Sequence, residues 1–248
     1  MAVLTSLSSK RANLGFALLH FLSAAVVGTM LPDDLPQNIE KPAVMFVNPN
    51  GKTGSFRINI KYLIIAFTLI TGMFHLLYAL RGMAGKLRYI EYAVTASIMI
   101  MIIQLLSGED NFQVLVLVLG LIASTMLFGF LQDDKIMYPG LSTAAFWFGW
   151  VPYIAAWFVV IMRFLNSVNS ANGDEVPGFV KSIIWIEFLI FSCFAFVQWW
   201  FVVRSARPVG GPRYDGAYNL LSITAKMLLV WFAFFGLRGI GDTSAPTT

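Results

Sequence analysis

Long apolar runs separated by short polar segments dominate this sequence. Seven of them are each close to the ~20 residues that a helix needs to cross a bilayer. These runs cover residues 12–31, 59–81, 87–107, 112–131, 139–165, 177–202 and 214–239. Gly and Pro mark most of the joints, as they do between helices in general. The pattern predicts an all-α membrane protein, a seven-transmembrane helix bundle that forms one domain over residues 1–248.

The longest polar connection, residues 32–58, lies between the first two runs. It carries four prolines and two patches suited to strands, AVMFV at 43–47 and SFRINI at 55–60. β-branched and aromatic residues bounded by turn formers are typical of short hairpins. We therefore predict a small β-hairpin in this loop.

Composition agrees with a membrane protein. Hydrophobic residues make up 58% of the chain and charged residues only 12%, about half the charged share of an average soluble domain. Basic residues do not alternate with aromatic ones, so the lipid bilayer and not nucleic acid is the expected partner. CxxC, HExxH, GxGxxG and Walker-type motifs do not occur. We therefore expect no enzymatic activity, no catalytic residue and no metal site.

The Lys and Arg distribution predicts the orientation. If the N-terminus is cytoplasmic, nine Lys and Arg residues flank the runs on the cytoplasmic side and seven on the other. Positive charge is typically enriched on the cytoplasmic side of membrane proteins. We predict a cytoplasmic N-terminus, an extracellular C-terminus and a long first extracellular loop.

Lys226 is the most unusual residue, because it lies in the middle of the last apolar run. A free ammonium at this depth costs roughly 2.5 to 3.5 kcal/mol, so we expect either a buried partner or a covalent bond such as a Schiff base. Only two acids, Glu91 and Glu187, are expected at membrane depth. Glu91 can be the counterion of the amine, or it can pair locally with Arg88. Ser222, one turn before Lys226, can reach its nitrogen or bond to its own helix.

Two histidines fall at depths similar to that of Glu91, in the predicted cytoplasmic half. His20 and His75 can accept a proton there, because imidazole titrates near neutrality. They can equally be buried packing residues. Tetrahedral zinc held by both histidines and Glu91 is a further alternative.

The sixth run places four residues at helical spacing on one face: Glu187, Phe191, Phe194 and Gln198. That face predicts an aromatic cavity with a polar group at each end. An acid within the membrane indicates a functional site. The alternative for Glu187 is a protonated, hydrogen-bonded acid that faces another helix.

Together these residues resemble the heliorhodopsin family of retinal proteins, over all seven runs. The resemblance is carried by RYIEY (88–92) with Ser97 and Met99 after it, SITAK (222–226), one histidine in each of the first two runs, FWFGWVPYIAAW (146–157) and Gln198. The family's cytoplasmic N-terminus agrees with the charge count. Its long first extracellular loop, which folds as a small sheet, agrees with the predicted hairpin.

The resemblance implies a light-sensing photoreceptor, usually a homodimer. It implies that Lys226 carries all-trans retinal as a protonated Schiff base and that Glu91 is the sole counterion, with Ser222 hydrogen-bonded near the Schiff base. His20 and His75 would belong to a polar cavity on the cytoplasmic side that takes up the Schiff-base proton, and Arg88 is expected among the proton-transfer residues. The retinal pocket would be lined by Met99, Trp150, Phe191 and Gln198.

Most members of the family do not pump ions, and the chain lacks two acids that proton-pumping microbial rhodopsins have. Ile102 stands where those pumps have a second acid, and Ser222 stands where they have an aspartate one turn before the lysine. Phe191 stands where they have a tryptophan against the retinal ring. Glu187 departs from the heliorhodopsin pattern, so light-gated passive proton transport is a second hypothesis. A retinal-free transporter with a Lys226–Glu91 ion pair is a third.

Overall fold

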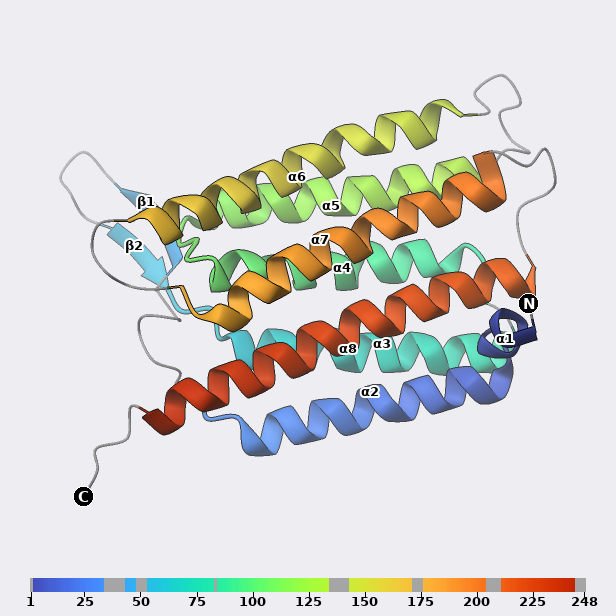
Figure 1. Cartoon of the computed structure of the whole chain (residues 1–248), viewed down its shortest axis with the longest axis horizontal. Coiled ribbons are helices and arrows are strands. Elements are labelled where there is room, and N and C mark those ends of the chain that lie inside the picture. The colour runs from blue at the N-terminus through green and yellow to red at the C-terminus, as the bar shows by residue number, and fades with distance from the viewer. Residues whose placement is uncertain are drawn as a thin grey trace.

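The computed structural model describes residues 2–33, 43–47, 53–82, 84–133, 143–170, 176–203 and 211–243. Within these residues, seven long helices run alongside one another, with a two-stranded sheet at one end and a short helix at the other (Figure 1). The elements are α1 (Ala2–Leu7), α2 (Lys10–Met30), β1 (Ala43–Val47), β2 (Thr53–Phe56), α3 (Ile60–Arg81), α4 (Leu87–Leu106), α5 (Phe112–Asp133), α6 (Ala144–Asn169), α7 (Gly178–Gln198), the π-helix η2 (Trp199–Val203) and α8 (Pro212–Thr243). The predicted seven-helix bundle with a small hairpin is confirmed.

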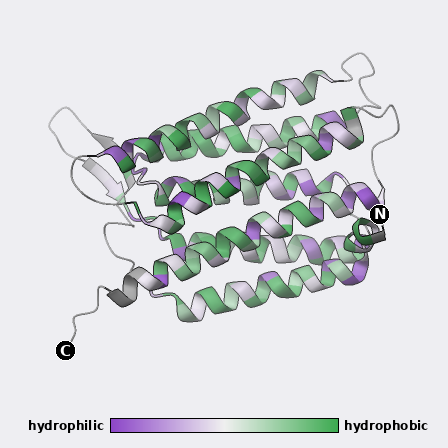
Figure 2. Ribbon diagram, in the orientation of Figure 1, coloured by the Kyte–Doolittle hydropathy of each residue, from purple (hydrophilic) through white to green (hydrophobic). Residues whose placement is uncertain are grey.

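The long helices form a closed ring. Consecutive helices from α2 to α8 pack side by side, and α8 closes the ring against α2. Each is long and apolar enough to cross a membrane. Hydrophobic residues fill their middle parts, and hydrophilic residues gather toward their ends (Figure 2). The chain is therefore an integral, multi-pass membrane protein. Below, the end of the bundle that carries α1 is the α1 end, and the opposite one is the hairpin end.

Local signals set several helix boundaries. Asn59 caps the start of α3, because its side chain accepts a hydrogen bond from the backbone N–H of Tyr62 at 3.4 Å. Gly82 ends α3 with φ +83°, a left-handed conformation that glycine adopts without steric cost. Helix α6 reaches Asn169, four residues past the predicted run, and the start predicted at 139–142 lies outside the described residues. The sixth run ends as the π-helix η2.

The two strands pair antiparallel and dock on the hairpin end of the bundle. Their register pairs Val44 with Ser55, and an irregularity follows before Phe46 pairs with Gly54. The backbone N–H of Val44 also donates to the carbonyl of Asp110, in the turn between α4 and α5, at 2.6 Å. The second predicted patch is only partly a strand, because residues 57–59 are irregular and α3 begins at residue 60.

A side-chain ion pair ties the residues after α2 to α3. The carboxylate of Asp33 accepts hydrogen bonds from the Lys61 amine at 2.8 Å and from the Tyr62 hydroxyl at 3.1 Å. These two bonds lower the pKa of Asp33 below its ordinary value. Both donors belong to the first turn of α3, so the contact fixes where that helix starts relative to α2.

Helix α1 was not predicted from the hydrophobic pattern. It packs across the start of α8, where the backbone of Leu4 lies directly against Gly216. A Cβ atom at position 216 would overlap the carbonyl oxygen of Leu4, so the contact requires glycine. The side-chain amide of Asn219, one turn further along α8, donates to the carbonyl of Leu7 at 2.9 Å.

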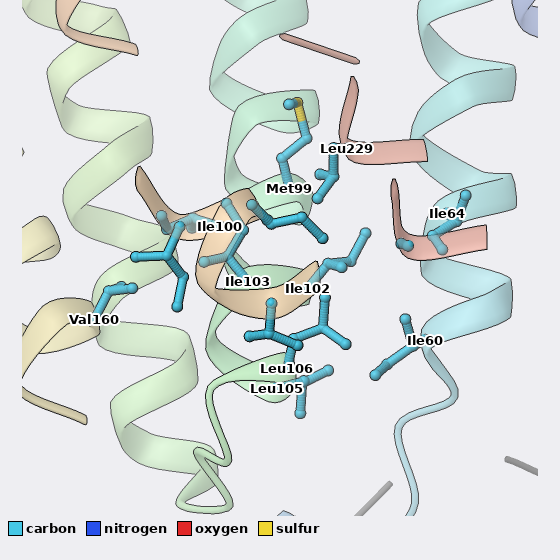
Figure 3. Packing of buried hydrophobic residues seen from close by; sticks show 14 of the residues in the cluster. Ile60, Ile64, Met99, Ile100, Ile102, Ile103, Leu105, Leu106, Val160 and Leu229 are labelled. Atoms are coloured by element: carbon cyan, nitrogen blue, oxygen red, sulfur yellow. The ribbon is translucent and has the colours of Figure 1, made fainter. Parts of the chain in front are cut away.

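The interior of the bundle differs between its two ends. Toward the hairpin end, the core is built mainly from branched aliphatic side chains. Figure 3 shows part of this packing, which includes Ile60, Ile64, Ile100, Ile102, Ile103, Leu105, Leu106, Val160 and Leu229. Toward the α1 end, the buried side chains include many polar and charged groups. The division sets the environment of every candidate functional residue.

Candidate functional site

Lys226 and Glu91 meet at the centre of the bundle. The amine of Lys226, on α8, forms a buried ion pair and hydrogen bond with Oε1 of Glu91, on α4. The hydroxyl of Tyr78, on α3, donates to Oε2 of Glu91 at 2.5 Å. One carboxylate therefore holds a cation on one oxygen and a phenol on the other. The alternative in which Glu91 pairs with Arg88 is wrong, because Arg88 forms its ion pair with Asp215.

Two adjoining cavities lead away from Lys226. The smaller, of about 310 Å³, is lined by Lys226, Ser222 and Met99 among others. The larger, of about 550 Å³, reaches Trp150 and Gln198. Four residues belong to both linings: Tyr92, Met126, Phe191 and Phe194.

The lining places the predicted pocket residues together. Met99, Trp150, Phe191 and Gln198 all face this continuous, mainly aromatic space. Ser222 also lines it. In the described part of the chain, however, no hydrogen bond joins the Ser222 hydroxyl to the Lys226 amine.

The two histidines lie against each other. The rings of His20 and His75 stack with centroids 5.7 Å apart, and both side chains are buried. Nδ1 of His75 donates to the side-chain oxygen of Asn13 at 2.9 Å. The ring of Tyr78 meets that of His75 edge-on at 5.5 Å. Tyr78 therefore touches both the histidine pair and the carboxylate of Glu91.

The structure does not support the zinc alternative. Among the residues that it describes, no three His, Cys, Asp or Glu side chains are grouped so that they could hold a metal ion. The contact between the histidine pair and Glu91 runs through the phenol of Tyr78 instead.

Glu187 is buried on α7 but stands apart from this site. Its side chain is almost inaccessible, and neither carboxylate oxygen has a hydrogen-bond partner among the described residues. The cavities reach Phe191, one turn nearer the α1 end, and stop short of Glu187. The expectation of a cavity with a polar group at each end is therefore wrong at this end.

Three further acids are buried among the described residues: Glu109, Asp133 and Asp215. Asp215 lies in the first turn of α8, and Asp133 is the last residue of α5. The guanidinium of Arg88, the ion-pair partner of Asp215, lies 4.7 Å from the ring centroids of both Tyr214 and Tyr218. Such faces attract cations. Aromatic packing thus keeps the helix ends buried where the sequence pattern indicates a polar flank.

Asp133 belongs to a hydrogen-bonded group that we call the tyrosine–aspartate cluster. Its members come from four helices and all are buried: Tyr89, Asp133, Gln198, Tyr214 and Tyr218. The cluster occupies the α1 end of the larger cavity, because three of its members line that cavity.

Comparison with protein families settles the relationship of the chain. The family model named Heliorhodopsin matches residues 9–237. The chain belongs to the heliorhodopsin family. No curated protein matches this heliorhodopsin.

Solved structures agree in fold. Halorhodopsin, a light-driven chloride pump, matches with a TM-score of 0.73 at 14% identity, covering 98% of each chain. Thermophilic rhodopsin from Rubrobacter xylanophilus matches with 0.72 at 13% identity, covering 94% of this chain and 96% of its own. Cyanorhodopsin from the cyanobacterium Tolypothrix sp. matches with 0.70 at 13% identity, covering 93% and 95%. At these identities the likeness shows a common fold and nothing about transport.

As a heliorhodopsin, the chain is a retinal-binding, light-responsive rhodopsin. Its residues fit that chromophore, because two adjoining, mainly apolar and aromatic cavities begin at a buried lysine. A cavity of this kind accommodates a polyene, and the ion pair at its end accommodates a cationic nitrogen. The family membership excludes the retinal-free transporter.

Proposed function

We propose that this protein is a light sensor in which Lys226 carries all-trans retinal as a protonated Schiff base with Glu91 as its sole counterion. The observation that carries the proposal is the buried Lys226–Glu91 ion pair at the end of an aromatic cavity. Bound retinal would supply absorption of visible light and a light-driven change of shape. The residues of the chain hold the charge, shape the pocket and receive the proton.

Glu91 and Tyr78 set the electrostatics of the site. Glu91 offsets a positive charge that costs several kcal/mol when it is buried alone. Tyr78 hydrogen-bonds the second oxygen of Glu91, which fixes the orientation of the carboxylate. Met99, Trp150 and Phe191 give the two cavities apolar walls.

The distribution of polar groups in the interior suggests where the Schiff-base proton moves. The stacked pair of His20 and His75 lies beside the site and contacts it through Tyr78, and imidazole can accept a proton near neutral pH. Opposite them, the hairpin half is mainly aliphatic. We propose that the proton moves to the histidine pair and returns, without net transport and without enzymatic turnover. With the N-terminus in the cytoplasm, the pair lies on the cytoplasmic side, and the protein acts as a homodimer.

The test is reconstitution with retinal. The purified protein, mixed with all-trans retinal, should develop a visible absorption band that hydroxylamine bleaches under illumination. Lys226→Ala should abolish the band. Lys61→Ala is the matched control, because it removes another buried lysine from a membrane helix outside the cavity. A band that persists in Lys226→Ala would reject the attachment site.

Glu187 supports a second candidate function, light-gated passive proton transport. It is a buried acid with no hydrogen-bond partner among the described residues, and an acid within a membrane is costly unless it serves a function. In voltage-clamped cells, this candidate predicts photocurrents that reverse with the applied voltage and decrease in Glu187→Gln. Absence of current at every voltage, or equal currents in the variant, would reject it.

A further inference from the structure

The tyrosine–aspartate cluster is a second polar site beside the cavity, and neither the counterion nor the histidine pair accounts for it. The hydroxyl of Tyr89 donates to Oδ2 of Asp133 at 2.9 Å. The hydroxyl of Tyr214 lies 2.9 and 3.0 Å from the two oxygens of the same carboxylate. The amide of Gln198 adds a longer contact at 3.3 Å. Three helices therefore direct hydrogen-bond donors at one acid on a fourth.

Asp133 is held by neutral donors. Among the described residues, no lysine or arginine forms a salt bridge with it. Arg88, the nearby cation, is committed to Asp215. The charged and titratable groups around the cluster are Arg88 and Tyr89 on α4, Tyr214, Asp215 and Tyr218 on α8, and Lys86, whose amine lies over the ring of Phe130 at 5.5 Å. A buried carboxylate without a cation partner gains stability when it takes up a proton.

The cavities connect this acid to Lys226. Tyr89, Gln198 and Tyr218 line the larger cavity, which continues into the smaller one around Lys226. Tyr92 lies between the two sites. Its ring centroid is 5.1 Å from the Lys226 amine, and its hydroxyl donates to the backbone carbonyl of Tyr218 at 3.5 Å.

Beyond Tyr92, a separate group of hydroxyls leads from Tyr218, which lines the cavity, to the acid. The hydroxyl of Tyr89 is 3.3 Å from that of Tyr218 and 2.9 Å from that of Tyr214. A phenol can donate and accept at once, so these groups can pass a proton toward Asp133.

We propose that Asp133 is a proton-accepting group of this protein, additional to the histidine pair. The inference rests on the proposed attachment of retinal to Lys226. After light absorption, the nitrogen at Lys226 loses one proton and its positive charge. Asp133 changes from carboxylate to carboxylic acid as an O–H bond forms. One hydroxyl that donated to Asp133 then turns to another acceptor; the Tyr214 hydroxyl has that of Tyr218 at 3.5 Å. Dark recovery reverses each change.

Infrared difference spectroscopy on protein labelled with ¹³C at the aspartate carboxyl groups tests the proposal. The light-minus-dark spectrum should show a positive band of a protonated carboxyl group that shifts with the label. Asp133→Asn should remove this band, because asparagine keeps the size of the side chain but cannot gain the proton. His20→Ala should retain it. A spectrum without a labelled carboxyl band, or with one unchanged in Asp133→Asn, overturns the proposal.

A second variant and a measurement without retinal keep the test valid if Asp133→Asn misfolds. Tyr214→Phe removes one donor to Asp133, so the labelled band should shift in frequency and persist. In protein without retinal, acid titration should produce an Asp133-dependent carboxyl band reversibly. Failure of that band to appear also overturns the proposal. If hydroxylamine-sensitive pigment forms normally while the Asp133 band is missing, the inference fails and the proposed attachment to Lys226 stands.

Discussion

Removal of the negative charge of Glu91 tests the centre of the proposed site. In Glu91→Gln, the cation on Lys226 loses its buried partner. The two side chains are only 3% and 1% exposed, so the cost is that of a broken buried pair, about 3 to 5 kcal/mol, and not that of an exposed one. At about 1.4 kcal/mol per pH unit, the midpoint of Schiff-base deprotonation should fall by roughly 2 to 4 pH units.

The assay is a spectroscopic pH titration of the pigment. The same variant should also shift the absorption maximum, because the counterion stabilises the ground-state charge. Glu187→Gln is the matched control, since it neutralises another buried acid that makes no contact with Lys226. It should leave both the midpoint and the maximum in place. Equal spectra for Glu91→Gln and the unmodified pigment across pH would refute the counterion assignment.

Three further predictions concern other buried contacts of the bundle. Tyr78→Phe removes a hydrogen bond to a charged group, worth about 1.5 to 3 kcal/mol, so the acid-induced spectral transition of the counterion should move up by roughly 1 to 2 pH units. Gly129→Ala brings a Cβ within 2.8 Å of the Tyr89 ring and should lower the free energy of unfolding by about 1 to 3 kcal/mol, measured by chemical denaturation; normal stability would contradict the contact. Asp215→Asn leaves Arg88 buried without its partner, so the thermal midpoint should fall clearly, at a cost of about 3 to 5 kcal/mol; an unchanged melting curve would mean that the pair contributes nothing.

The sequence predicts the bundle well because the length of an apolar run and the Gly and Pro residues that separate the runs are local properties of the chain. A run of about 20 apolar residues fixes a membrane helix whatever its neighbours are. Lys226 and Glu91 are recognisable for the same reason, since each interrupts an apolar run with a charge. That Lys226 pairs with Glu91 can be established only from the structure. The sequence nevertheless leaves few other partners, because charged residues are rare in the apolar runs.

The remaining site residues escape prediction because their burial depends on neighbouring helices. Asp133 and Asp215 lie at helix ends, which a linear reading treats as solvated. Three tyrosines pack around those ends and close them off. Tyr78 resembles any aromatic residue of a membrane helix until its contact with Glu91 is seen. A signal was available, because Tyr214 and Tyr218 lie one turn apart on the helix that carries Lys226.

Helix α1 and the position of Glu187 illustrate the same limit. Six residues are too few for a hydrophobic pattern to be decisive, and α1 is held by a backbone contact with Gly216. Helical spacing correctly placed Phe191, Phe194 and Gln198 on the cavity face. It could not show that the cavity ends before Glu187, because the extent of a cavity depends on side chains from several helices.

The division of the interior into an aliphatic hairpin half and a polar α1 half has an electrical consequence. Voltage across a membrane falls mainly over the least polarisable layer, here the aliphatic packing between Lys226 and the hairpin. A unit charge that crosses the full field exchanges about 2.3 kcal/mol per 100 mV with it. A proton that moves from Lys226 to the histidines or to Asp133 stays within the polar half and crosses little of that drop. The movement of this proton should therefore produce almost no transient current in a capacitive recording. The resting potential of the cell should hardly change its rate or extent.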